Sequence, residues 1–233
     1  YRDLADPLAL LRHRDSTGLR DYWSYVPGGN NPDDGHREYS QLMSSSLALI
    51  SDHILETYPL GDYRGLVDVA GGTGHFARMV KKRYPDIDAT VLDLPEVVSE
   101  AKRQFPQTDI RFVATDMFRS PLPPDTECFS LVRVLHDHDD EPVVALLTRL
   151  HSALKPGGHL LIAEPMAGTA GAEPIGDTYF SFYLWAMGSG RPRTAKELKA
   201  MCLAAGFSGI REFKTPIPAL TRVLVAEKAP KNP

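Results

Sequence analysis

From Gly61 onward, short apolar runs alternate with amphipathic stretches along the chain. Continuous apolar runs are typical of strands that are buried on both faces of a parallel sheet. They predict strands at residues 66–70, 89–92, 110–113, 129–135 and 160–164. The amphipathic stretches predict helices near residues 76–84, 96–104 and 142–154. This order of elements favours successive strand–helix units and a parallel sheet.

The last third of the chain does not continue the pattern of strand–helix units. The sequence Lys155-Pro156-Gly157-Gly158 stops the preceding helix, and Thr194 with Glu197 fits a capping box for a helix that ends at Gly206. Two strands at 210–214 and 221–226 then predict a hairpin. We therefore expect an α/β, Rossmann-like fold with a mostly parallel seven-stranded sheet and a C-terminal antiparallel hairpin. A dinucleotide-binding fold would instead continue with a sixth parallel strand.

Residues 8–58 have helical periodicity, interrupted by a Pro- and Gly-containing loop at 27–35. Within 39–55 the apolar residues recur at helical spacing: Leu42, Met43, Leu47, Ile50 and Ile54. We expect a helical lead-in over residues 1–60 and one α/β domain over 61–233. The chain does not begin with Met, so we expect it to be a fragment of a longer protein.

Composition narrows the class of protein only a little. The 233 residues carry a net charge of −4, which gives no global field to attract a nucleic acid. No apolar run approaches the roughly 20 residues that span a bilayer, and charges occupy the place of a signal peptide's apolar stretch. Cys128 and Cys202 share no motif spacing, which favours a reduced, cytoplasmic protein.

The glycine-rich turn Val69-Ala70-Gly71-Gly72-Thr73-Gly74 joins the first strand to a helix. Small residues allow a ligand to approach the backbone, and the N–H groups at a helix start favour a carboxylate or phosphate. The sequence Gly72-x-Gly74-x-x-Ala77 also fits the nicotinamide-dinucleotide fingerprint. The turn alone therefore predicts a nucleotide-like ligand, with a tight turn that binds nothing as the alternative.

Two acids follow the next two strands. Asp93 could accept hydrogen bonds from the hydroxyls of a ribose, or it could cap the helix that begins near Pro95. Asp116 could receive the amino group of an adenine while Met117 or Phe118 packs on the ring, or it could be a solvated loop residue.

His136 follows the fourth strand in the sequence Leu135-His136-Asp137-His138-Asp139-Asp140-Glu141. Its ordinary pKa near ~6.5 suits a general base at neutral pH. A metal site is the rival interpretation, but consecutive carboxylates more often begin a solvated helix, so we predict no metal. Further on, residues 179–187 hold five aromatic side chains, which could line a substrate tunnel or form a buried packing helix.

Taken in order, these motifs resemble the small-molecule O-methyltransferases of the caffeate and acetylserotonin type. The resemblance continues through Ala163-Glu164-Pro165 and Gly190-Arg191-x-Arg193-Thr194. Within that family, residues 164–194 look most like the bacterial enzymes that methylate hydroxycarotenoids such as hydroxyneurosporene. The resemblance implies a catalytic domain that uses S-adenosyl-L-methionine, acts in carotenoid biosynthesis and transfers a methyl group by in-line displacement.

The resemblance also implies roles for individual residues. His136 would be the general base, and Glu164 would flank it. Tyr183 and Met187 would contact the substrate. The remaining residues would hold the cofactor: Ala70, Gly71, Gly72, Asp93, Leu94, Asp116, Met117 and Val132.

Three departures from the family pattern affect these expectations. Ala70 stands where relatives begin a triple glycine, so we expect backbone contact there but no left-handed conformation. His138 replaces a Trp, and Pro192 replaces a second flanking acid. The family's N-terminal dimerisation domain is absent from this chain, so residues 1–60 would be a remnant of its linker and the full-length protein a homodimer.

Several alternatives stay open at this point. The acceptor could be a phenolic or polyketide metabolite, and an apolar substrate could involve peripheral membrane contact. A nicotinamide-dependent oxidoreductase or a non-catalytic cofactor-binding protein is less favoured. A nucleic-acid methyltransferase is disfavoured because the polar-Pro-Pro-aromatic sequence of base-methylating enzymes is missing after the fourth strand.

Overall fold

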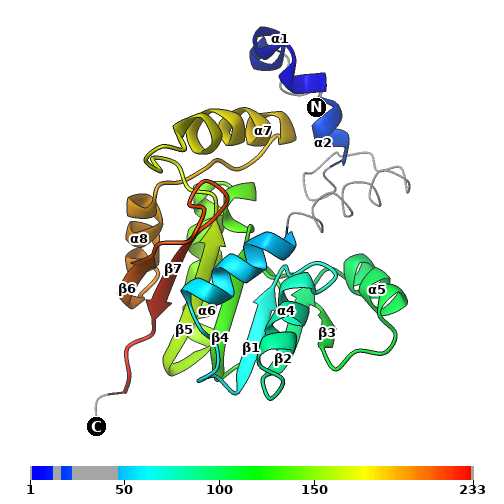
Figure 1. Cartoon of the computed structure of the whole chain (residues 1–233), viewed down its shortest axis with the longest axis vertical. Helices are drawn as coiled ribbons and strands as arrows, with labels where there is room; N and C mark the ends of the chain where they lie inside the picture. The colour runs from blue at the N-terminus through cyan, green and yellow to red at the C-terminus, as the bar shows by residue number, and fades with distance from the viewer. Residues whose placement is uncertain (1, 13–16, 23–46, 232–233) are drawn as a thin grey trace.

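The computed structural model describes residues 2–12, 17–22 and 47–231, and a seven-stranded sheet forms its centre (Figure 1). The strands are β1 Gly65–Val69, β2 Asp88–Asp93, β3 Arg111–Ala114, β4 Thr126–Val132, β5 Leu154–Glu164, β6 Ser208–Phe213 and β7 Arg222–Glu227. Their order is β3-β2-β1-β4-β5-β7-β6. The first five strands are parallel, and β7 is antiparallel to β5 and β6. The predicted fold is confirmed.

The α-helices that follow β1 along the chain are α4 His75–Arg83, α5 Pro95–Gln104, α6 Asp140–Ala153, α7 Phe180–Met187 and α8 Ala195–Ala204. Residues 47–57 are also helical, whereas the rest of the helix expected over 39–55 and the loop at 27–35 lie outside the described residues. The capping box of Thr194 and Glu197 is present at the start of α8. None of the helices in the described residues is long and apolar enough to cross a membrane.

Both faces of the central strands are buried, which explains why these strands have continuous apolar runs in the sequence. Alternate residues of β4 point to opposite faces. Phe129 and Leu131 pack in a cluster with α6 and α8, whereas Cys128 packs in a cluster with α4 and the helix at 47–57. Full burial of each large apolar side chain contributes about 1.5–3 kcal/mol to folding.

The N-terminal segments pack on α7 rather than on the sheet (Figure 1). They are η1 Arg2–Leu4, α1 Pro7–Arg12 and α2 Gly18–Tyr22. Leu10 and Leu19 are buried against Leu184, and the Thr17 hydroxyl donates to the Ala186 carbonyl oxygen at 2.5 Å. This contact fixes α7 from its outer side. The expected division of the chain into a helical lead-in over residues 1–60 and an α/β domain over residues 61–233 stays a prediction.

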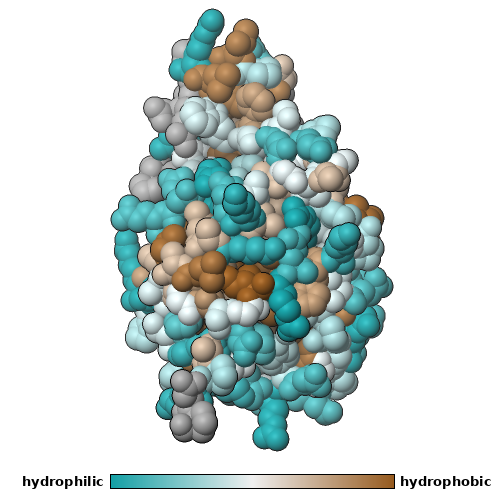
Figure 2. All heavy atoms as spheres, turned by 90° about the vertical axis from the view of Figure 1, so that its left-hand side faces the viewer, coloured by the Kyte–Doolittle hydropathy of each residue, from teal (hydrophilic) through white to brown (hydrophobic). Residues whose placement is uncertain are grey.

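The face that carries α8 and the edge strand β6 is largely hydrophilic around a central apolar area (Figure 2). On β6, the Glu212 carboxylate pairs with Lys199 of α8 and Arg222 of β7. Charged side chains on an edge strand discourage its pairing with a strand of another chain.

Ala70, which directly follows β1, has a φ of +52°. The expectation that it avoids the left-handed region was therefore wrong. Its N–H donates to the Leu92 carbonyl oxygen at 2.8 Å, and two residues later the Gly72 N–H must reach Asp93. These two hydrogen bonds to β2 fix the conformation of the turn. They outweigh the cost of about 1–2 kcal/mol that a left-handed conformation has for alanine.

We expect Ala70→Gly to leave the free energy of unfolding unchanged or to raise it by up to about 1 kcal/mol. Glycine relieves the positive φ while it adds entropy to the unfolded chain. Ala101→Gly in the interior of α5 is the control and should cost about 1 kcal/mol or more. Urea unfolding measures the free energy of unfolding of both variants. A larger loss of stability in Ala70→Gly than in the control would contradict the interpretation that the backbone of Ala70 is strained.

Candidate active site

The carboxyl ends of the five parallel strands lie at one edge of the sheet, and most of the predicted site residues follow them. Strand register places Val69 opposite Leu92, Asp93 opposite Ala114, and Val132 opposite Ala163. Ligands in open α/β sheets bind outside these strand ends. The predicted residues of this edge are Ala70, Gly71, Gly72, Asp93, Leu94, Asp116, Met117, Val132, His136 and Glu164.

Asp93 joins the glycine-rich turn to the loop after β2. Its Oδ2 accepts from the Gly72 N–H at 2.7 Å, and its Oδ1 accepts from the Leu94 N–H at 2.8 Å. Burial raises the pKa of this carboxyl, and the two backbone bonds oppose that rise. Leu94, not Asp93, is the N-cap residue of α5, and the helix has no side-chain cap bond. The structure therefore does not support the helix-cap alternative.

Asp68 lies buried beneath the same turn. Ser130 Oγ donates to its Oδ1 at 2.6 Å, whereas its Oδ2 has no hydrogen-bond partner in the part of the chain that the structure describes. Burial raises the pKa of Asp68 to about 7. A Cβ on Gly71 would overlap this carboxylate, but the Cβ position of Gly72 faces open space. The turn is thus closed below by Asp68 and open at Gly72, as a backbone cradle for a ligand requires.

The loop after β3 is held from the side of α6. Asp116 Oδ1 accepts from the Phe118 N–H at 2.8 Å, and Arg149 Nε donates to the Met117 carbonyl oxygen at 3.1 Å. Arg149 also donates to the carbonyl oxygen of Ser120. Met117 and Phe118 are partly buried against the large core cluster. The loop that carries Asp116 is therefore fixed by contacts within the protein.

His136 lies in a short 3₁₀ turn, η3 (Leu135–Asp137), between β4 and α6. Its imidazole is buried, with Nε2 3.3 Å from Asp137 Oδ1 and Nδ1 3.5 Å from Glu164 Oε2. The backbone N–H of His136 also donates to Glu164 Oε2 at 3.2 Å. The structure thus brings together the two residues predicted to be catalytic and adds Asp137 on the other side of the ring.

The two carboxylates govern the protonation of this imidazole. Burial alone lowers the pKa of His136, but the charges of Asp137 and Glu164 outweigh it and raise the pKa to about 9. In the absence of a ligand, the imidazole is therefore mostly protonated at neutral pH. A positively charged ligand nearby would oppose this protonation and favour the neutral form that a general base needs.

His138 has a different environment from His136. Its ring packs edge-on against Phe118, with ring centroids 5.0 Å apart. Burial is the main cause that lowers its pKa. Within the described ranges, no three His, Cys, Asp or Glu side chains are arranged to hold a metal ion.

The aromatic helix α7 places Phe180, which the sequence did not single out, beside the candidate base. The Phe180 ring lies 6.0 Å from that of His136, between centroids. Tyr183 and Met187 lie in the buried cluster that α7 forms with the N-terminal segments, and Phe180 packs against this cluster and against the Tyr183 ring. Their contact with a substrate stays a prediction. Phe180 precedes Tyr183 by three residues, so helical spacing could have placed it on a neighbouring part of the same surface.

Two further features near this ring were not predicted. A turn of π-helix, η4 (Pro174–Tyr179), leads into α7, and such turns are frequent at functional sites. Arg133, directly after β4, has a φ of +58°, and its guanidinium lies 5.9 Å from the Phe180 centroid. Neither feature has a signature in the sequence, because each depends on segments that are distant along the chain.

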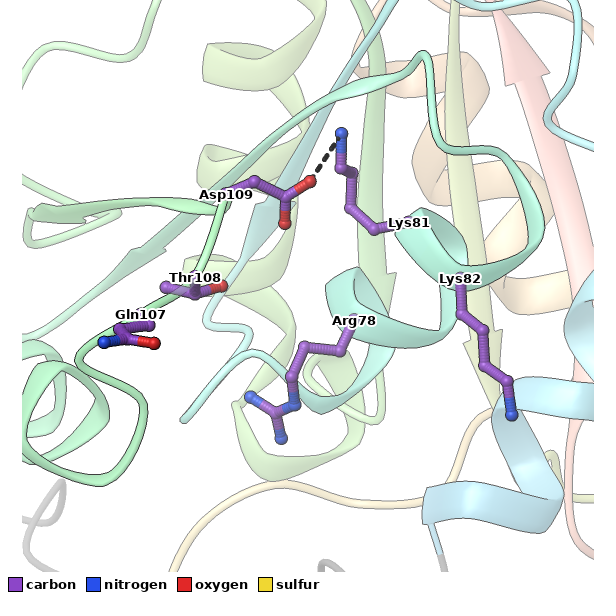
Figure 3. A pocket seen from close by; sticks show the side chains of 6 residues that line it. All are labelled: Arg78, Lys81, Lys82, Gln107, Thr108 and Asp109. Atoms are coloured by element: carbon purple, nitrogen blue, oxygen red, sulfur yellow. Dashed lines mark ion pairs between the residues drawn. The ribbon is translucent and has the colours of Figure 1, made fainter.

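A surface pocket elsewhere contains none of the predicted site residues (Figure 3). Its lining comes from α4 and the segment before β3: Arg78, Lys81, Lys82, Gln107, Thr108 and Asp109. Lys81 Nζ already contacts Asp109 at 2.9 Å and donates to the carbonyl oxygens of Pro85 and Ile87. Arg78 donates to the Thr73 carbonyl oxygen and lies over the Phe105 ring. These cations support the fold locally.

The O-methyltransferase domain family matches residues 1–208 of the chain. The chain belongs to this family. The demethylspheroidene O-methyltransferase of Rhodobacter capsulatus is 43% identical over 98% of this chain and 58% of its own length. The mouse acetylserotonin O-methyltransferase is 36% identical over 91% of this chain and 49% of its own length.

Solved structures agree with the family. The chain resembles human N-acetylserotonin methyltransferase in complex with SAM, with a TM-score of 0.84 and 25% identity, over 98% of this chain and 67% of that one. The expected family and the class I methyltransferase fold are thus confirmed. The chain spans less than two thirds of the length of the curated relatives described above.

We expect Glu164→Gln to lower the pKa of His136 by about one unit or more, because it removes one of the two carboxylates that favour the imidazolium. The measurement is an NMR titration of the imidazole nitrogens, assigned with His136→Gln. The wild-type ring should titrate near pH 9. Asp116→Asn is the matched control and should leave this titration unchanged. An unshifted titration in Glu164→Gln would refute the pairing.

Proposed function

We propose that this chain is the catalytic part of an S-adenosylmethionine-dependent O-methyltransferase that methylates a hydroxyl group of a hydroxycarotenoid. The arrangement of His136 carries the proposal. Its buried imidazole lies between two carboxylates, which stabilise the imidazolium that proton removal forms, and beside the apolar ring of Phe180. The 43% identity to a demethylspheroidene O-methyltransferase supports the choice of acceptor.

The residues at the sheet edge fit the cofactor. S-adenosylmethionine supplies an electrophilic methyl group on a positively charged sulfonium when it is bound. Asp93 retains acceptor capacity beyond its two backbone bonds for ribose hydroxyls. The open side of Gly72 gives a ligand access to the backbone, and the unpaired oxygen of buried Asp68 favours a positively charged one. In this proposal, Ala70, Gly71 and Gly72 line the methionine portion, Asp93 and Leu94 the ribose, Asp116 and Met117 the adenine, with Val132 as a backbone contact.

The proton would pass to the Nε2 atom of His136. Glu164 is wholly buried at the end of β5, with Oε2 3.5 Å from Nδ1 and accepting from the backbone N–H of His136 at 3.2 Å, so in this proposal it orients the base. Asp137 is less enclosed and contacts Nε2 in the absence of substrate. A substrate hydroxyl would therefore compete with Asp137 for this nitrogen. A tertiary aliphatic alcohol is less acidic than a phenol, which makes the proton acceptor more important for a carotenoid.

A phenolic acceptor is the second candidate, because acetylserotonin O-methyltransferases are also among the relatives. It would use the same cofactor residues and the same base. The homodimer and the peripheral membrane contact expected of the longer protein stay predictions.

We expect the full-length protein to transfer labelled methyl groups to hydroxyneurosporene-type carotenoids faster than to simple phenols. The apolar surface beside His136 favours a long polyene over a small polar ring. Chromatography of the labelled products measures the transfer, and heat-denatured protein is the control. Transfer to phenols alone would overturn the carotenoid acceptor and leave the methyltransferase intact.

We expect His136→Ala to lower kcat by about 10²–10⁴-fold, the usual contribution of general base catalysis. Its affinity for S-adenosylhomocysteine in calorimetry should change little, because the imidazole does not hold the cofactor. His151→Ala, at an imidazole of α6 that packs on Phe207, is the control. Undiminished transfer by His136→Ala would exclude the histidine as the base.

A further inference from the structure

Arg193 carries a charge in a place where a charge is costly. Its side chain is 0% exposed. A buried guanidinium is tolerated only when its donors are paired. Arg193 satisfies this with bonds to three residues, and all three lie in one short stretch of chain on either side of His136.

We call residues 135–140 the histidine loop. Arg193 Nη1 donates to the Leu135 carbonyl oxygen at 2.8 Å, directly before His136, and Nη2 donates to the His138 carbonyl oxygen at 2.6 Å. Arg193 Nε and Nη2 both contact Asp140 Oδ1, at 2.9 and 2.7 Å. One side chain thus binds the backbone before the candidate base, the backbone after it, and the carboxylate that begins α6.

Neighbours of Arg193 reinforce the same loop. Ser189 Oγ donates to the Asp137 carbonyl oxygen at 2.8 Å, and the Gly190 N–H donates to Asp139 Oδ1 at 3.0 Å. A Cβ on Gly190 would overlap the His136 carbonyl oxygen, so the two segments are in direct contact. Residues 189–193 directly follow α7 and its C-cap Gly188, which joins the aromatic helix to the histidine loop.

We propose that Arg193 is a positioning residue that holds the imidazole of His136 in place for proton transfer through the backbone of the histidine loop. This rests on the proposed function of His136 as the base. Arg193 reaches that base through carbonyl groups and Asp140, so it acts on the geometry of the site.

Arg191 provides a matched control. It binds the same carboxylate, Asp140 Oδ2 at 2.9 Å, and also Glu197 at 2.8 Å, but within the described residues it donates to no carbonyl oxygen of the histidine loop. Its side chain is 41% exposed, so its ion pairs contribute little to stability.

The test compares Arg193→Lys, Arg193→Met and Arg191→Met in the full-length protein. We expect Arg193→Met to lower kcat by about 10- to 100-fold, the usual effect of a misplacement near 1 Å, with nearly unchanged affinity for S-adenosylhomocysteine. Arg193→Lys should have a kcat between those of the wild type and Arg193→Met, because an ammonium group can replace only some of the hydrogen bonds that the guanidinium donates. Arg191→Met should keep the wild-type kcat.

A second readout follows the imidazole itself. A loosened loop separates His136 from Glu164, which lies outside the loop on β5, so the NMR titration of His136 in Arg193→Lys should move down from about pH 9. This titration needs no turnover, so it tests the positioning even if His136→Ala shows that the histidine is not the base. Arg193→Lys also covers the case in which Arg193→Met does not fold. A folded Arg193→Lys with wild-type kcat and titration would overturn the proposal, as would equal losses in Arg191→Met.

Discussion

Parallel pairing of the first five strands is the constraint on which the rest of the structure depends. Because these five strands are parallel, their carboxyl ends lie at the same edge of the sheet, so residues far apart in sequence meet there. A slip of one residue would turn Phe129 and Leu131 from one core face to the other. The two buried faces of the sheet therefore fix the register, and the register places Asp93 beside the glycine-rich turn and Glu164 beside His136.

Buried carboxyl groups are the second property of this edge. Asp68, Asp93 and Glu164 are all nearly or wholly enclosed. Burial raises the pKa of Asp68 and of Asp93, because a carboxylate that is removed from water loses the hydration of its charge. A cationic ligand offsets such a cost, and a sulfonium compound is one. The site proposed here would thus gain stability from the cofactor, and the loss of a positive charge after methyl transfer would weaken that gain.

Much of the fold could be predicted because its determinants are local. Apolar runs located the five parallel strands, and the pair Thr194 and Glu197 located the start of α8. The errors arose where a segment's conformation depends on hydrogen bonds to residues that are distant in the sequence. The fifth strand begins at Leu154 rather than near residue 160, since Gly157 and Gly158 exchange backbone bonds with Lys228. Ala70 adopts a positive φ because β2 fixes the turn, which no inspection of the turn itself reveals.

The same distinction separates the residues expected at the site from those that support it. Asp93 ends β2 and His136 comes shortly after β4, so strand order alone placed them, whereas Glu164, the last residue of β5, was expected from the family resemblance. Arg149 and Arg193 could not be found that way, although Arg193 stands in a motif, because each reaches across to a loop from another element. Loops leave carbonyl groups without strand or helix partners, and a guanidinium offers five donors in a rigid fork. A site built on strand ends therefore needs such cross-links, since parallel strands position the start of each loop and leave its backbone to be held from outside.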